Sequence, residues 1–126
     1  DAACSGSPGR LEYRGVDLQS KKEIFRQGPY RNGTNNVGEF LAIVQALMML
    51  EKIGSSLPVY SDSETAIAWV KAKRCNTQLS ADKTNAPLFE LIDRAEDWLD
   101  EHKKTNPVLK WDTRAWGEIP ADFNRK

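Results

Sequence analysis

The chain has 126 residues and a mass of 14.2 kDa, which favours a single domain, residues 1–126, with a core of its own. Its 18 acidic and 18 basic residues balance, so net charge gives no support for nucleic-acid binding, and any such binding must come from local patterning. No apolar run reaches the roughly 18 residues that cross a bilayer, and no signal-peptide pattern is present. The start at Asp1, without an initiator methionine, is compatible with a trimmed fragment.

The N-terminal part is typical of strands. Residues 1–4 end a first strand before the turn "SGSPG", and residues 10–18 and 21–28 form a predicted hairpin. Cys4 and Cys75 have neither metal-site nor disulfide-framework spacing, so we expect free thiols in a reducing compartment such as the cytoplasm.

Helical patterns dominate the middle of the chain. Residues 36–53 have apolar side chains at helical spacing, and Gly54 ends the pattern. After an apolar strand at residues 57–61, Ser63 is the expected N-cap of a second helix. A third helix is predicted at 86–103, with an inner stripe formed by Leu88, Leu91, Ile92, Ala95, Trp98 and Leu99.

A last strand is predicted at residues 107–111, and Pro120 is placed to open a short terminal helix. The resulting order is β-β-β-α-β-α-α-β-α. Strands that first meander and then alternate with helices predict an α/β domain with a mixed sheet covered by helices.

Four acidic residues lie where such a sheet would bring them together. Asp1 ends the first strand, Asp62 follows the strand at 57–61, and Asp122 falls in the first turn of the terminal helix. Glu39 has capping-box spacing from Asn36, but at about 100° per residue it falls on the margin of the apolar face.

Each acid alone is more simply a helix cap or a partner of the helix dipole. Together, several carboxylates without an obvious cationic partner repel unless divalent cations neutralise them. Oxygen ligands select Mg²⁺ or Mn²⁺, and two such ions can promote phosphodiester hydrolysis. The single histidine, His102, lies in a charged stretch and is expected to be solvated.

The segments "DAACSGSPG", "TNNVGEFLAI", "VYSDSETAI", "LKWDT" and "WGEIPADFNRK" resemble, in order and spacing, type 1 ribonuclease H, and in particular the short bacterial form without a basic protrusion. The resemblance implies a ribonuclease H-like fold with a five-stranded sheet, three strands antiparallel and the rest parallel. It implies hydrolysis of the RNA strand of RNA–DNA hybrids with two Mg²⁺ ions, for which Mn²⁺ may substitute, leaving 5′-phosphate and 3′-hydroxyl ends. The four carboxylates match the metal ligands, and Glu118 matches an auxiliary acid for turnover or product release.

The same resemblance assigns nucleic-acid contacts. Cys4, Ser5, Gly6 and Asn35 match positions that meet RNA 2′-hydroxyls, the group that distinguishes RNA from DNA. The remaining matches are Thr34, Asn36 and Thr77 for a DNA phosphate, Trp69 along the DNA groove, and Glu64 where close relatives have a glutamine donor.

Simpler structural interpretations stay open for several of these. Asn35 and Asn36 could be cap residues, Trp69 a core residue, and residues 71–74 a solvated basic helix end. The departures from the family pattern are Ser7, Glu64, Gln78 and Pro120, and none removes a metal ligand.

Two alternative functions share the fold. A DNA strand-transferase or junction nuclease would tend to bring DNA-binding extensions, and a catalytically silent binding module would lack one of the acids. We expect a monomer whose substrate is an RNA–DNA hybrid; an N-terminal hybrid-binding domain is common in the family.

Overall fold

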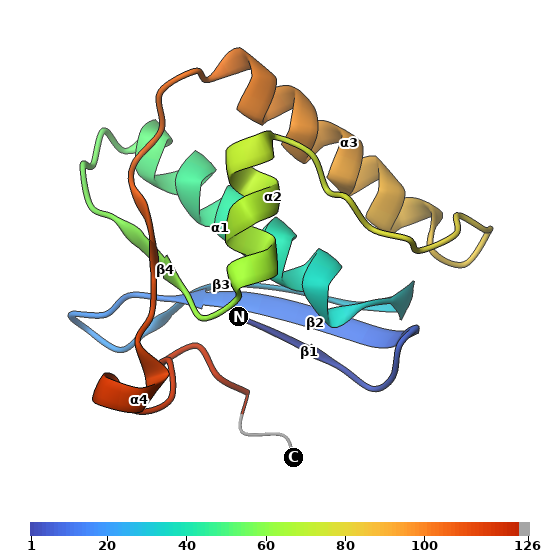
Figure 1. Cartoon of the computed structure of the whole chain (residues 1–126), viewed down its shortest axis with the longest axis horizontal. Helices are drawn as coiled ribbons and strands as arrows, with labels where there is room; N and C mark the ends of the chain where they lie inside the picture. Colours follow the sequence, from blue (N-terminus) through green and yellow to red (C-terminus); the bar gives the residue numbers. More distant parts are fainter. Residues whose placement is uncertain (124–126) are drawn as a thin grey trace.

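The structure, a computed structural model, describes residues 1–123. Three antiparallel strands form its main sheet: β1 (Ala2–Cys4), β2 (Gly9–Val16) and β3 (Glu23–Gly33), in the order β1-β2-β3. Helices α1, α2 and α3 lie on one side of this sheet, and the C-terminal segment lies on the other (Figure 1). The expected strands at the N-terminus are therefore confirmed.

Strand β3 is longer than the predicted hairpin arm, which ended at Gly28. Pairing with β2 continues to Gly33. The strand accommodates Gly28, where φ is +102°, by a bulge at which the register against β2 shifts. The predicted end of the strand at Gly28 is therefore an irregularity within β3.

Helix α1 (Asn35–Lys52) begins one residue earlier than predicted, because its N-cap is Thr34. The Thr34 hydroxyl accepts a hydrogen bond from the Val37 N–H at 3.3 Å. The capping box predicted between Asn36 and Glu39 is therefore wrong, since Asn36 lies inside the first turn.

Helices α2 (Glu64–Ala72) and α3 (Ala86–Glu101) follow the predicted pattern. Ser63 is the N-cap of α2, and its hydroxyl accepts from the Ala66 N–H at 3.1 Å, as expected. Beyond α3, the His102 ring stacks on Trp98 and is half-buried, so the prediction of a solvated histidine is wrong.

Strands β4 (Val59–Ser61) and β5 (Val108–Lys110) pair in parallel. This three-stranded antiparallel sheet, parallel pair and helical cover confirm the predicted α/β class. Among the described residues the backbone ladders form two groups, β1-β2-β3 and β4-β5, where one continuous five-stranded sheet was expected.

A short helix, α4 (Thr113–Trp116), follows β5 and was not predicted. Asp112 caps it by accepting from the Ala115 N–H at 3.1 Å. The helix expected from Pro120 is not present in residues 120–123, where the chain makes a turn closed by the Asp122 N–H and the Ile119 carbonyl at 2.9 Å. The rest of that predicted helix lies outside the described residues.

The apolar core lies between the main sheet and the helices, and α1 contributes more of its buried residues than any other element. Gly38 lets α1 approach the sheet, because a Cβ there would lie 2.5 Å from Leu11 Cδ1 and 2.7 Å from Ala2 Cβ. This close approach places the first turn of α1 directly over β1. None of the described helices has the length and hydropathy needed to span a membrane.

Candidate active site

Three acidic side chains from separate elements meet at one edge of the sheet. Asp1 precedes β1, Glu39 lies in the first turns of α1, and Asp62 follows β4. One carboxylate oxygen from each lies within 4.8 Å of the others. The fold thus brings together residues that are 38 and 61 positions apart from Asp1 in the chain.

Glu39 is the most enclosed member of this group, with 4% of its surface exposed. The pKa of its carboxyl is raised from 4.5 to about 7, chiefly by burial and also by the nearby Asp62 carboxylate. The Asp1 ammonium, the Ala2 N–H and the Asn35 side chain act in the opposite direction. A buried acid beside other acids favours a bound cation, because the cation stabilises its charged form.

The three acids line a cavity of about 1030 Å³, here called the carboxylate cavity. Asp122 lines the same cavity from the C-terminal segment, outside the group whose oxygens lie within 4.8 Å. Other lining residues come from the β1–β2 turn, from α1 and from β2; they include Cys4, Ser5, Arg10, Glu12 and Asn35.

The donors in this cavity fit a hard divalent cation. All three clustered groups are carboxylates, the oxygen donors that Mg²⁺ and Mn²⁺ prefer. Within residues 1–123, the salt bridges join Arg14 and Arg26 to Glu23 and Arg74 to Asp100, so no lysine or arginine side chain neutralises the three acids.

A compact turn between β1 and β2 forms one wall. The Ser5 N–H donates to the Arg10 carbonyl at 3.0 Å, and the Arg10 N–H donates to the Ser5 hydroxyl at 2.8 Å. The Cys4 thiol donates to the Gly6 and Gly33 carbonyls at 2.9 Å and 3.3 Å. Both cysteines are free thiols, as expected.

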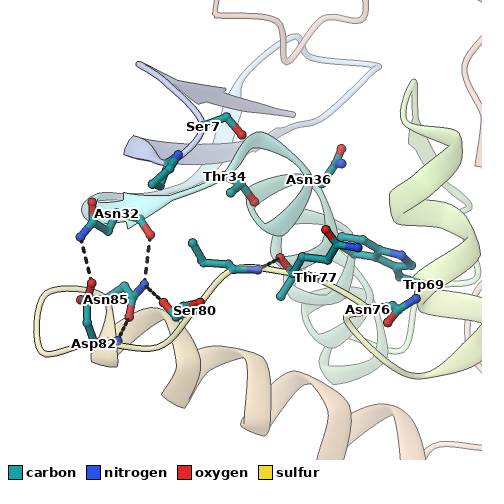
Figure 2. A pocket seen from close by; sticks show the side chains of 13 residues that line it. Ser7, Asn32, Thr34, Asn36, Trp69, Asn76, Thr77, Ser80, Asp82 and Asn85 are labelled. Carbon is teal, nitrogen blue, oxygen red and sulfur yellow. Dashed lines mark hydrogen bonds between the residues drawn. The ribbon is translucent and has the colours of Figure 1, made fainter.

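A second cavity, of about 660 Å³, is lined by residues of the same turn and of the α1 N-terminus, together with the loop before α3 (Figure 2). We call it the amide cavity, because five of its lining residues carry carboxamide side chains. Thr34, Asn36, Trp69 and Thr77, all predicted DNA contacts, line it together. The other polar lining residues are Ser7, Asn32, Asn76, Gln78, Ser80, Asp82 and Asn85.

Buried Asn85 fixes the floor of the amide cavity. Its side-chain amide donates to the Ser80 carbonyl at 2.9 Å and the Asn32 carbonyl at 3.3 Å, and its oxygen accepts from the Asp82 N–H at 2.8 Å (Figure 2). This network ties the loop before α3 to the end of β3. The Thr77 hydroxyl accepts from the Leu79 N–H at 3.1 Å, which stabilises the loop that faces α1.

The sequence of this chain is similar to those of known proteins. A family model described as RNase H matches residues 1–111. The chain is 33% identical over 125 residues to the ribonuclease H of Ehrlichia ruminantium, covering 96% of this chain and 78% of that protein. It is 32% identical over 108 residues to the ribonuclease H of Trichodesmium erythraeum, covering 82% of this chain and 68% of that protein. The chain belongs to the ribonuclease H family.

A solved structure agrees with the fold. The N-terminal RNase H domain of a Mycobacterium tuberculosis protein, determined as a fusion with maltose-binding protein, superposes with a TM-score of 0.54. It covers 93% of this chain and 86% of that chain at 18% identity. The family assignment makes the chain an endoribonuclease that acts on RNA–DNA hybrids, with the carboxylate cavity as its candidate active site.

Several residues matched to the family's nucleic-acid contacts line one of the two cavities of this ribonuclease H. Cys4, Ser5 and Asn35 line the carboxylate cavity. Trp69 is half-buried, packs edge-on against Phe40 at 6.3 Å and also lines the amide cavity. Its core role and its position at a cavity are thus compatible.

Other matched residues lie outside both linings. Glu118 is exposed in the loop after α4, and Glu64 is exposed at the start of α2. Gly6 lies between Ser5, which lines the carboxylate cavity, and Ser7, which lines the amide cavity. In the basic segment at 71–74, Arg74 pairs with Asp100 at 3.0 Å.

The sequence did not predict several residues that line the amide cavity or hold the segment that includes Asp122. Asn85, Ser80 and Asn76 line the amide cavity, and Asn85 is almost fully buried. The pattern around them is an ordinary polar loop before a helix, so nothing local distinguishes them. Arg14 was missed because the carbonyls that its side chain binds, those of Ala121 and Asp122, are more than 100 residues away.

Proposed function

We propose that this ribonuclease H hydrolyses the RNA strand by a two-divalent-cation mechanism, leaving 5′-phosphate and 3′-hydroxyl ends. Asp1, Glu39, Asp62 and Asp122 hold the ions, with Mg²⁺ as the natural metal and Mn²⁺ able to substitute. The supporting observation is the convergence of three carboxylates within 4.8 Å in a cavity that Asp122 also lines.

When bound, such ions neutralise the phosphate and activate water for attack. The protein contributes oxygen ligands that come from separate parts of the fold: the residue before β1, helix α1 and the residue after β4. Glu39 lies on a buried helical turn and Asp62 directly after β4, so both are held by regular structure. This rigidity favours catalysis, because ligands placed before the metal binds need little rearrangement.

In this proposal the carboxylate cavity binds the RNA strand of the hybrid and the amide cavity binds the DNA strand. Asn35 and the turn at Cys4 and Ser5 face the RNA strand beside the carboxylates, where a 2′-hydroxyl can be read. In the amide cavity, Thr34, Asn36 and Thr77 bind a phosphate of the DNA strand. Neutral amide and hydroxyl donors suit a phosphate that is positioned without being cleaved.

Cleavage assays test this proposal most simply. RNA–DNA hybrid, duplex RNA and duplex DNA of one sequence are each incubated with Mg²⁺, with Mn²⁺ and with EDTA. The proposal predicts cleavage of the RNA in the hybrid alone, none in EDTA, and products that a ligase can rejoin through their 5′-phosphates. Cleavage in EDTA, or equal cleavage of duplex DNA, would contradict it.

Glu118 is proposed as the auxiliary acid for product release. It is exposed and near the C-terminal segment that includes Asp122. Glu118→Gln is expected to slow multiple-turnover cleavage while leaving a single turnover at saturating enzyme nearly unchanged. Equal slowing in both regimes would instead assign Glu118 to the chemical step.

A further inference from the structure

We propose that Arg14 is a positioning residue that joins the two ends of the active site, holding Asp1 through its backbone and Asp122 through its side chain. The inference rests on the proposed role of Asp122 as a metal ligand. Arg14 lies on β2, behind the carboxylate cavity, and is not among the residues that line it.

The backbone of Arg14 holds Asp1 from both sides. The Arg14 N–H donates to the Asp1 carbonyl at 2.9 Å, and the Asp1 amino group donates to the Arg14 carbonyl at 2.9 Å. This pair of bonds continues the β1–β2 ladder, in which Ala2 faces Tyr13. Two backbone hydrogen bonds therefore fix Asp1 against β2.

The side chain of Arg14 holds the C-terminal segment. Its Nε donates to the Ala121 carbonyl at 2.8 Å, and a terminal nitrogen donates to the Asp122 carbonyl at 2.5 Å. Two donors of one planar guanidinium thus bind two successive carbonyls, which fixes the direction of the backbone at Asp122. A single donor would leave the segment free to rotate about the contact.

The surroundings hold the guanidinium in place. It lies 4.8 Å from the centre of the Phe123 ring and 3.5 Å from a Glu23 oxygen, and its side chain is 19% exposed. Arg26 shares both neighbours: it lies 5.1 Å from the same ring and 2.8 Å from the same carboxylate oxygen, but its side chain is 41% exposed. The bonds to the Ala121 and Asp122 carbonyls come from Arg14 and not from Arg26.

This difference makes Arg26 a matched control. Arg14→Met and Arg26→Met each remove one positive charge, one contact with Phe123 and one bond to Glu23. Only Arg14→Met also removes the bonds to the carbonyls at 121 and 122. Arg14 also acts electrostatically on the Asp1 amino group, so an effect of Arg14→Met is assigned to the position of Asp122 only together with the exchange measurement below.

The experiment measures kcat and KM on the hybrid, and the Mg²⁺ concentration that half-saturates the rise in unfolding temperature. For Arg14→Met we expect kcat to fall by about ten- to a hundredfold, because small displacements of a catalytic group are costly. We expect KM to stay within about twofold and the half-saturating Mg²⁺ to rise several-fold. Arg26→Met should match the unsubstituted chain; equal behaviour of the two variants would overturn the proposal.

Amide hydrogen exchange gives a readout that is independent of activity. The Asp122 N–H, bonded to the Ile119 carbonyl, should lose protection in Arg14→Met and keep it in Arg26→Met. If Arg14→Met does not fold, Arg14→Lys is measured instead. Lysine keeps the charge but not the paired donors, so an intermediate loss of kcat and protection is expected, and full activity with full protection would overturn the proposal.

Asp122→Asn separates this inference from the proposed function. If that variant cleaves normally, the ligand role of Asp122 fails, and the inference fails with it. If Asp122→Asn loses cleavage while Arg14→Met keeps it, the proposed function stands and the inference alone fails. If Arg14 acts through Asp122, the double variant should be no slower than Asp122→Asn.

Discussion

Asn35 and Asn36 are consecutive residues in the first turn of α1, yet Asn35 lines the carboxylate cavity and Asn36 lines the amide cavity. Successive helical residues point about 100° apart, so one turn of helix can face two sites. Thr34 makes this possible by capping the helix, which leaves the side chains of both asparagines exposed. The α1 N-terminus thus separates the cavity proposed to bind the RNA strand from the cavity proposed to bind the DNA strand.

Asn36→Ala should weaken hybrid binding by about tenfold without changing kcat, because one donor to a DNA phosphate is worth about 1.4 kcal/mol. Binding is measured in EDTA to prevent cleavage, over a series of salt concentrations. A normal dissociation constant with a lowered kcat would contradict the assignment.

Asn35→Ala is the companion variant and should have a different effect. Asn35 donates to the Glu39 carboxylate at 3.5 Å and is proposed to meet the RNA sugar. We expect reduced discrimination between a hybrid and a substrate with a 2′-deoxy substitution beside the cleavage site. The same loss of discrimination in Asn36→Ala would show that the two cavities do not divide the strands.

The buried Glu39 should make the metal-free protein less stable at neutral pH. Because its pKa is raised to about 7, the folded state keeps a proton that the unfolded chain loses above pH 4.5. Stability is therefore fully present below pH 4.5 and falls as the pH rises through 7. Glu39→Gln should abolish this fall and, in EDTA at pH 8, raise the free energy of unfolding by an amount on the order of 3 kcal/mol.

Urea unfolding in EDTA at pH 4 and pH 8 measures this effect. The two proteins should have similar stability at pH 4, and Mg²⁺ should stabilise the unsubstituted chain but not Glu39→Gln. Parallel loss of stability by both proteins between these pH values would show that Glu39 is not the titrating group.

Gly38→Ala should reduce activity by moving α1 away from β1. The new Cβ would lie 2.5 Å from Leu11 Cδ1 and 2.7 Å from Ala2 Cβ, and both neighbours are buried. Overpacking of this kind costs about 1–3 kcal/mol. Because Glu39 follows Gly38 and Asp1 precedes Ala2, the same displacement should separate two proposed ligands and lower kcat.

Gly54→Ala provides the control for loss of stability alone. Its φ is +69° and nothing lies within 4 Å of the added Cβ, so the cost, about 1 kcal/mol, comes from backbone strain. The variant should unfold more easily and cleave normally. Normal cleavage by Gly38→Ala would contradict the link between the α1–β1 contact and the site.

The position of Glu39 illustrates what the sequence can predict. Helical phase placed its side chain on the margin of the apolar face, and the structure buries it. Asp62 lies directly after β4, as predicted from its place at a strand end. Asp1 was expected to end the first strand but precedes β1, so that placement was wrong, although its carboxylate does meet that of Asp62. Such predictions succeed because the periodicity of a helix and the ends of strands are local properties of the sequence.

Other features depend on contacts that local patterns do not contain. Thr34, Asn35 and Asn36 are all residue types that cap helices, so the sequence alone does not rank them, and the structure places the N-cap at Thr34. The sequence predicted that the strand ends at Gly28, but in the structure β3 bulges there and continues to pair with β2 beyond it. The bonds from Arg14 to the carbonyls at 121 and 122 join residues that are more than 100 positions apart, and no local pattern in the sequence predicts such a pairing.

The central claim is that the clustered carboxylates hold the catalytic metal, and Asp62→Asn tests it most directly. The substitution keeps the size of the side chain but removes a charge from the group whose oxygens lie within 4.8 Å. Cleavage of the hybrid in Mg²⁺ is measured together with hybrid binding in EDTA. The account predicts that cleavage is abolished and binding is retained; undiminished cleavage in Mg²⁺ would contradict it.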